Sequence, residues 1–239
     1  MNRHDHRRTR GWARTGTDFF LQHLDRLSDA DLARPSLLPG WSRAHVAGHL
    51  ARNADALRRL VTWAQTGIET PMYRDAAQRR DEIEQSVRLA PPQLRDDIRA
   101  AAQRLDEALS ALDDEQWTTQ VRSAKGRLIP ATEIPWMRVR EVWLHAIDLD
   151  AGASLHDLPP DVTDCLLDDV VGSFTGRDGM PALVLRPTDR DRIWEVTAGG
   201  RPTEVRGPAA AVLGWLVGRS DGQDLDAVDA ALPSVPAWL

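Results

Sequence analysis

The sequence predicts an α+β protein in which a bundle of four long helices precedes a smaller α+β domain. Three observations support this fold class. Apolar residues recur with a helical period over roughly residues 10–150, in runs long enough for bundle helices. Segments containing proline and glycine separate these runs. The composition changes beyond Gly152, so we expect the bundle to span residues 1–152 and the second domain residues 153–239.

The first two bundle helices are predicted from apolar periodicity and from the residues that flank it. Residues 1–8 are polar, and we expect them to form a frayed terminus, with the first helix beginning near Gly11. The second helix is expected to begin after Ser42, a residue type that commonly caps helix amino termini. Gly67 marks its end.

The remaining helices of the bundle are predicted from the same signals. Residues 73–87 form a candidate helix of charged composition, and Pro91 begins a clearer amphipathic helix. Residues 121–129 break the helical pattern and are expected to form an irregular or hairpin-like connection. Thr132 is the expected N-cap of the next helix, which ends before Gly152.

The second domain is expected to combine helices with a small antiparallel sheet. The Pro159–Pro160 pair begins one helix, and Pro208 begins another. Between them, residues 183–185 and 193–196 have the composition of short strands, and residues 203–205 are a candidate third strand.

The most informative stretch is the helical run of residues 136–149, WMRVREVWLHAIDL, because it carries Glu141 and His145 one helical turn apart. Side chains at that spacing project from the same face of a helix. Carboxylate and imidazole groups are both zinc ligands, so the pair is a candidate for metal binding. The alternative is a hydrogen-bonded Glu–His pair in the core, which is the commoner arrangement for an isolated pair of this kind.

A metal site needs a third ligand, which must come from another part of the chain. His49 is the first candidate, because it lies mid-helix on a face of alanine and glycine where a neighbouring helix can approach closely. His45, one turn earlier, is the competing candidate, since two histidines at this spacing also have metal-ligand spacing. Either histidine could instead form hydrogen bonds within the bundle.

Composition excludes several classes of protein. A net charge of −6 argues against a broad surface for nucleic acid. Cys165 is the only cysteine, so neither an internal disulfide nor a cysteine-based metal motif can form. The amino terminus does not have the pattern of a signal peptide, and no segment approaches the ~20 apolar residues needed to cross a membrane. We therefore expect a cytoplasmic protein without a membrane partner, and nothing in the sequence demands more than a monomer.

Two motifs resemble those of the mycothiol-dependent maleylpyruvate isomerases. Residues 38–57, LPGWSRAHVAGHLARNADAL, resemble the first motif of this family, and residues 126–149, GRLIPATEIPWMRVREVWLHAIDL, resemble the second. The first motif by itself indicates only the wider DinB-like superfamily of bundle proteins. The resemblance runs from near residue 10 to the carboxyl end, and it includes residues 69–73, 218–222 and 236–239.

The resemblance implies a DinB-like four-helix bundle followed by a small α+β domain. In this family a zinc ion is held by the second histidine of the first motif and by the glutamate and histidine of the second. The matching residues here are His49, Glu141 and His145, whereas His45 is not a ligand in that pattern. The catalytic arginine of the family lies in the carboxyl-terminal domain and matches Arg219.

The reaction implied by the resemblance is the conversion of maleylpyruvate to fumarylpyruvate, a step in gentisate breakdown, with mycothiol as the thiol cofactor. Reversible addition of a thiolate to the conjugated alkene allows rotation about the former double bond. Cys165 has no activating neighbour in the sequence, so an external thiol fits better, and a His₂Glu zinc site leaves a position open for it. Arg219 is suited to orienting the substrate carboxylate and stabilising the enolate. We expect the second domain to bring Arg219 near the zinc, so that the active site lies between the domains.

The roles of three other residues, and two other functions, stay open from sequence. Asp148 returns to nearly the same helix face as Glu141, and it either hydrogen-bonds a ligand, caps the helix or faces solvent. Arg138 and Arg140 either contact the anionic substrate or mycothiol, or form exposed salt bridges. A different mycothiol-dependent enzyme, such as an S-transferase or a detoxifying enzyme, and a non-catalytic metal- or ligand-binding bundle are the alternative functions.

Overall fold

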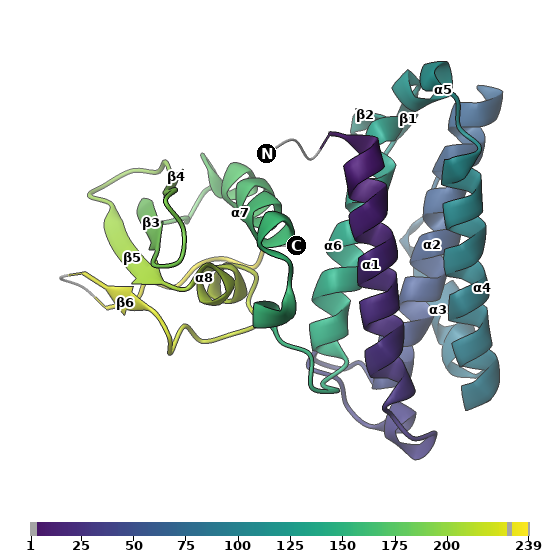
Figure 1. Ribbon diagram of the computed structural model, residues 1–239, viewed down its shortest axis with the longest axis horizontal. Helices are drawn as coiled ribbons and strands as arrows, with labels where there is room; N and C mark the ends of the chain where they lie inside the picture. Colours follow the sequence, from purple (N-terminus) through teal and green to yellow (C-terminus); the bar gives the residue numbers. More distant parts are fainter. Residues whose placement is uncertain (1–3, 229–230, 239) are drawn as a thin grey trace. The chain divides into compact units, whose positions relative to one another are not determined.

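The computed structural model describes residues 4–228 and 231–238. The chain forms two compact units, Asn2–Ala153 and Ser154–Leu239. The first unit is mainly helical, and the second combines helices with a small sheet (Figure 1). The predicted α+β class is therefore confirmed. Leu239, the last residue of the closing motif, and the first three residues of the chain lie outside the described residues.

Helices α1, α2, α4 and α6 lie side by side in the first unit and form the predicted four-helix bundle (Figure 1). Helix α3 packs against α2. Of the two alternatives for residues 121–129, an irregular or a hairpin-like connection, the hairpin-like one is present, as an antiparallel pair of short strands. In chain order, the elements are α1 (His6–Asp25), η1 (Ala30–Ala33), α2 (Arg43–Thr66), α3 (Ala76–Val87), α4 (Pro91–Ser110), α5 (Asp114–Thr118), β1 (Gln120–Arg122), β2 (Leu128–Pro130), η2 (Ala131–Glu133) and α6 (Ile134–Asp148).

The ends of several helices follow the local sequence signals. Ser42 caps α2 as predicted: its hydroxyl accepts a hydrogen bond from the His45 backbone N–H at 3.4 Å, and its own N–H donates to Nδ1 of His45 at 3.1 Å. Gly67 follows the last turn of α2 in the left-handed conformation, with φ 71°. Pro91 begins α4, where its missing N–H costs no helical hydrogen bond.

Two predicted helix starts are wrong. Helix α1 begins at His6 rather than near Gly11, because the Asp5 carboxylate accepts hydrogen bonds from backbone N–H groups of the first turn and so caps the polar segment. Thr132 is not an N-cap. It lies inside the 3₁₀ turn η2, which runs directly into α6 at Ile134, so no side-chain cap is needed there.

The bundle core depends on close approach between helices as well as on apolar side chains. Gly16 of α1 faces α6, where an added Cβ atom would lie 2.6 Å from Nε1 of Trp143. Trp136 and Trp143 of α6 are both buried in this core. Among residues 4–228 and 231–238, no helix is long and apolar enough to cross a membrane.

The second unit contains a four-stranded sheet in the order β4-β3-β5-β6. The predicted strands are present, but the prediction of a purely antiparallel sheet is wrong. β4 and β6 pair antiparallel with their neighbours, whereas β3 and β5 pair in parallel. The chain turns back beside one edge of β3 to form β4 and then crosses to the other edge, so β5 runs in the same direction as β3. The elements are η3 (Leu155–Asp157), α7 (Pro160–Phe174), β3 (Leu183–Pro187), β4 (Trp194–Val196), β5 (Thr203–Gly207), α8 (Ala209–Leu216) and β6 (Asp226–Ala227).

Candidate metal centre

Three candidate ligands from two helices meet in the first unit. His49 of α2 and Glu141 and His145 of α6 each offer a ligand atom, and these atoms lie within 4.8 Å of one another. Nε2 of His49 is 2.8 Å from Oε2 of Glu141, and Nε2 of His145 is 3.2 Å from the same oxygen. The two imidazole rings are nearly perpendicular, at 87°, with centroids 4.8 Å apart. The nitrogens of both histidines therefore converge on one carboxylate oxygen.

Direct packing of α2 against α6 brings the three residues together. Helical spacing alone places Glu141 and His145 on one face of α6. On α2, His49 is buried beside Ala47, Gly48 and other small residues, as its sequence context predicted. Small side chains let the helix axes approach closely enough for the imidazole to reach the facing helix.

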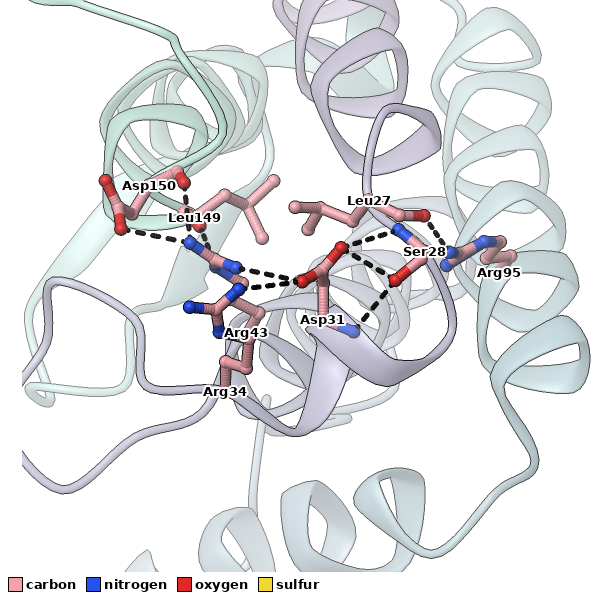
Figure 2. Close-up of polar contacts among 8 residues, drawn as sticks. All are labelled: Leu27, Ser28, Asp31, Arg34, Arg43, Arg95, Leu149 and Asp150. Atoms are coloured by element: carbon pink, nitrogen blue, oxygen red, sulfur yellow. Dashed lines mark hydrogen bonds and ion pairs between the residues drawn. The ribbon is translucent and has the colours of Figure 1, made fainter.

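A polar network joins the end of α6 to the start of α2 (Figure 2). Arg43, in the first turn of α2, donates hydrogen bonds to the carbonyl oxygens of Leu149 and Asp150, each at 2.8 Å, and to the Asp150 carboxylate at 3.0 Å. The carboxylate of Asp31 lies 4.0 Å from the same guanidinium. The network satisfies carbonyl groups at the helix end and holds the last turn of α6 beside the helix that carries His49.

Replacing Arg43 with glutamine is expected to lower the free energy of unfolding by about 2–3 kcal/mol, because the buried carbonyl group of Leu149 and the partly buried carbonyl group of Asp150 lose a charged hydrogen-bond donor. Urea titration followed by circular dichroism measures the change. Arg34→Gln is the matched control, since Arg34 is an exposed arginine that pairs with the same Asp31, and its loss should change stability by less than about 0.5 kcal/mol. Equal stability of the two variants would contradict the proposed importance of the network.

Asp148 supports one member of the cluster directly. Its Oδ2 lies 2.8 Å from Nδ1 of His145, and the residue has no exposed surface. The alternative in which Asp148 faces solvent is therefore wrong. Carboxylate partners of this kind fix the orientation and tautomer of a histidine whose other nitrogen binds a metal.

His45, the competing candidate, does not belong to the cluster. Its Nδ1 accepts the hydrogen bond from Ser42 that completes the cap of α2, and its Nε2 lies 3.4 Å from the Glu84 carboxylate on α3. Among the described residues, the group with metal-binding geometry contains His49 and not His45.

The charges of the cluster shift the pKa values of its members. Burial raises the pKa of Glu141, but the charges and hydrogen bonds of His49 and His145 outweigh this effect and hold the pKa well below its usual range. Burial lowers the pKa of His145, yet its hydrogen bonds to Asp148 and Glu141 outweigh burial, and the pKa is raised. At His49 burial dominates and lowers the pKa. The low pKa of Glu141 keeps its carboxylate ionised near neutral pH, which is the form that binds a metal.

Two side chains that the sequence did not single out contact His49. Nη2 of Arg79 on α3 lies 3.4 Å from Nδ1 of His49, and the Trp41 ring lies edge-on to the imidazole with centroids 5.5 Å apart. Gly48 permits this approach of α3, since an added Cβ atom would lie 2.8 Å from Cβ of Ser86. The charged composition of α3 did not indicate that Arg79 contacts His49, because arginines are common on solvent-exposed helix faces.

Arg138 is buried, with 2% of its surface exposed, so the prediction of an exposed salt bridge is wrong for this residue. Its Nη1 donates to the backbone oxygen of Leu50 at 2.8 Å and to Oδ1 of Asn53 at 2.9 Å, both on α2. Burial lowers the pKa of Arg138 to about 10. Arg140 is half-buried, and its contact with substrate or mycothiol stays a prediction.

Arg219 belongs to the second unit, directly after α8. Its backbone N–H donates to the carbonyl oxygen of Gly214 at 2.8 Å, and its Nη1 donates to that of Val217 at 2.9 Å. The side chain is half-buried. Its approach to the cluster, and an active site between the two units, stay predictions.

The donor set of the cluster fits a zinc ion. Two imidazole nitrogens and one carboxylate oxygen form a common catalytic zinc set, in which a fourth position stays open. Tetrahedral ligands about 2.1 Å from a zinc ion lie about 3.4 Å from one another. The two nitrogen–oxygen separations, 2.8 and 3.2 Å, need only small side-chain movements to reach that spacing.

The fold and the cluster together define a class: helical-bundle proteins with a two-histidine, one-carboxylate group between facing helices, followed by a small α+β domain. Comparison with family models makes the assignment specific. The model described as "Mycothiol maleylpyruvate isomerase N-terminal domain" matches residues 13–150, and the one described as "MDMPI C-terminal domain" matches residues 157–237. The chain therefore belongs to the mycothiol maleylpyruvate isomerase family, which is a family of enzymes.

Two solved structures are similar to this chain over the whole length of both chains. One is a crystal structure of the mycothiol-dependent maleylpyruvate isomerase, with 33% identity, a TM-score of 0.94 and 100% of each chain covered. The other is a variant of that enzyme with one histidine replaced by alanine, with 32% identity, a TM-score of 0.94 and the same coverage. No curated protein matches the chain.

Proposed function

We propose that this chain converts maleylpyruvate to fumarylpyruvate by cis–trans isomerisation, with mycothiol as its thiol cofactor and a zinc ion held by His49, Glu141 and His145. The observation that supports the proposal is the convergence of three ligand atoms within 4.8 Å in a chain of this family. Gentisate breakdown in the cytoplasm is the setting that the proposal implies.

The metal-binding residues would prepare the site for a thiol. A zinc ion bound here would lower the pKa of a thiol at its open position, so that the thiol is present as the nucleophilic thiolate. Glu141 reduces the charge of the site by one, and Asp148 holds the ring of His145 in place through its 2.8 Å contact with Nδ1.

Arginine side chains would bind the anionic substrate. Arg219 is permanently cationic. Its proposed role is to bind a carboxylate of the substrate and to stabilise the negative charge of the enolate that forms after thiolate addition. Arg79 is a second candidate, because its guanidinium already lies beside His49. Two arginines suit a substrate that carries two carboxylates, since each can bind one of them bidentately.

The decisive experiment is an assay of the zinc-loaded protein with maleylpyruvate, with and without mycothiol. Isomerisation that requires both zinc and mycothiol is the expected result. Turnover of other mycothiol adducts without isomerisation would indicate a transferase or detoxifying enzyme, and metal binding without either activity would indicate a binding protein. Each of these two results would refute the proposal.

Cys165→Ser is expected to leave isomerase activity within about twofold of the unmodified protein, because the nucleophile is external. Cys165 is 1% exposed, and burial, followed by the charge of Asp168, raises the pKa of its thiol to about 11. The thiol is therefore neutral and inaccessible near neutral pH. Steady-state kinetics at saturating mycothiol is the measurement, and lost turnover in a variant that is folded by circular dichroism would contradict the mechanism.

Asp148→Asn is expected to weaken zinc binding ~10–100-fold, because an amide holds His145 less firmly and supplies no negative charge. Competition with a fluorescent chelator measures the affinity. Glu84→Gln is the matched control: Glu84 contacts His45, outside the cluster, and should leave the affinity unchanged. If Asp148→Asn binds zinc as tightly as the control, Asp148 does not support the metal site.

A further inference from the structure

A cavity lies within the bundle, between α1 and α4, and none of the three cluster residues lines it. Its volume of about 340 Å³ is within the range of small-molecule sites. Part of its wall is apolar and part is charged, with four arginines and two aspartates. The apolar part includes Ala102, Leu105 and Leu109, and the charged part includes Arg10, Arg138 and Asp106.

Two of the four arginines already have close carboxylate partners. Arg14 forms a bidentate pair with Asp106, at 2.7 and 2.9 Å, and Arg99 pairs with Asp25 outside the cavity. Arg10 lies 3.9 Å from the same Asp106, which is already bound to Arg14, and its Nη2 donates a hydrogen bond to the neutral hydroxyl of Ser110. In the described part of the chain, Nε of Arg10 has no hydrogen-bond partner. Arg10 is therefore only weakly neutralised.

Arg138 is the most deeply buried of the four, and no carboxylate of the described residues forms an ion pair with it. Its hydrogen bonds go to the neutral oxygens of Leu50 and Asn53, and its Nε has no hydrogen-bond partner within residues 4–228 and 231–238. Glu141, one turn further along α6, is hydrogen-bonded to the two histidines of the cluster. The charges of Glu141 and Asp55 act on Arg138 through space, but neither carboxylate forms an ion pair with it. A guanidinium with 2% exposure is ordinarily in contact with an anion, so Arg138 places a positive charge in the cavity wall that no carboxylate of the described residues contacts.

We propose that this cavity binds a small organic carboxylate, independently of the metal centre. The carboxylate group would lie toward Arg138 and Arg10, because the planar guanidinium matches carboxylate geometry. The hydrocarbon body would pack against Leu105 and Leu109 on α4. The apolar part of the wall selects such a ligand over an inorganic anion, which would leave that surface uncovered.

Sodium hexanoate is a suitable probe, measured by isothermal titration calorimetry on the full-length protein in both its zinc-loaded and its metal-free form. One site with equal affinity in both forms is expected. Hexan-1-ol lacks the charge and sodium sulfate lacks the hydrocarbon body, so each should bind at least about tenfold more weakly. Binding that requires zinc would place the carboxylate on the metal instead, and equal binding of sulfate would contradict the proposed ligand class.

Variants locate the site. Ala102→Trp, which fills the half-buried rim of the cavity, and Arg138→Gln should each weaken hexanoate binding at least about tenfold. Arg104→Gln, on α4 but paired with Asp55 outside the cavity, should bind normally. If Arg138→Gln fails to fold, Ala102→Trp decides the question. No heat of binding, or normal binding by Ala102→Trp, would overturn the proposal. If the proposed isomerase function is wrong, the hexanoate result still stands, because the binding measurement needs neither turnover nor metal.

Discussion

The His49→Ala variant will lose its metal and its isomerase activity together. His49 supplies one of three proposed ligand atoms, and its Nε2 lies 2.8 Å from the carboxylate oxygen that the other histidine also faces. Loss of a supporting partner of a ligand already costs ~10–100-fold in metal affinity, so loss of the ligand itself should exceed that range. Metal analysis after gel filtration, together with steady-state kinetics on the same samples, measures both quantities.

His45→Ala is the matched control, one turn earlier on the same helix. It should keep its metal and its turnover and lose about 1 kcal/mol of stability, because His45 completes the cap of α2 rather than facing Glu141. Equal metal loss in both variants would mean that the substitutions act by disturbing helix α2, and not through the loss of a ligand at His49. Full metal content in His49→Ala would refute the ligand assignment.

Arg219→Ala is expected to keep its zinc and lose turnover ~100–1,000-fold, because its proposed partner is the substrate rather than the metal. The separation of metal content from activity distinguishes this residue from the three ligands. Arg219→Lys should recover only part of the activity, since an ammonium group binds a carboxylate without the bidentate geometry of a guanidinium. Metal analysis and kinetics on both variants, at saturating mycothiol, are the measurements.

Arg206→Ala provides the control in the same unit. Arg206 is an exposed arginine of β5 that pairs with Glu204, so its removal should leave turnover unchanged. If Arg219→Ala has the turnover of Arg206→Ala, Arg219 is a surface residue and the proposed site between the two domains is wrong.

Local sequence was sufficient to predict most helices, the approximate positions of the strands, and the shared helix face of two of the three residues in the candidate metal cluster. Ser42, Gly67 and Pro91 act through short-range backbone chemistry, so their effects are visible without a fold. Glu141 and His145 share a face in any α-helix, because 3.6 residues per turn bring positions four apart together. These inferences needed only geometry that every helix has in common.

Packing between elements far apart in the sequence decided the rest. His45 and His49 lie one turn apart on α2, so helical spacing alone does not decide which of them faces α6. The packing of α2 against α6 directs His49 to Glu141, whereas His45 turns back to Ser42. Arg138 belongs to a residue type that is usually exposed, but in this fold its side chain is buried in the core.

The parallel pairing of β3 with β5 likewise depends on which edge of the sheet the chain returns to. Long-range contacts of this kind are set by the shapes of the packed surfaces, and neither periodicity nor capping signals along the chain encode those shapes.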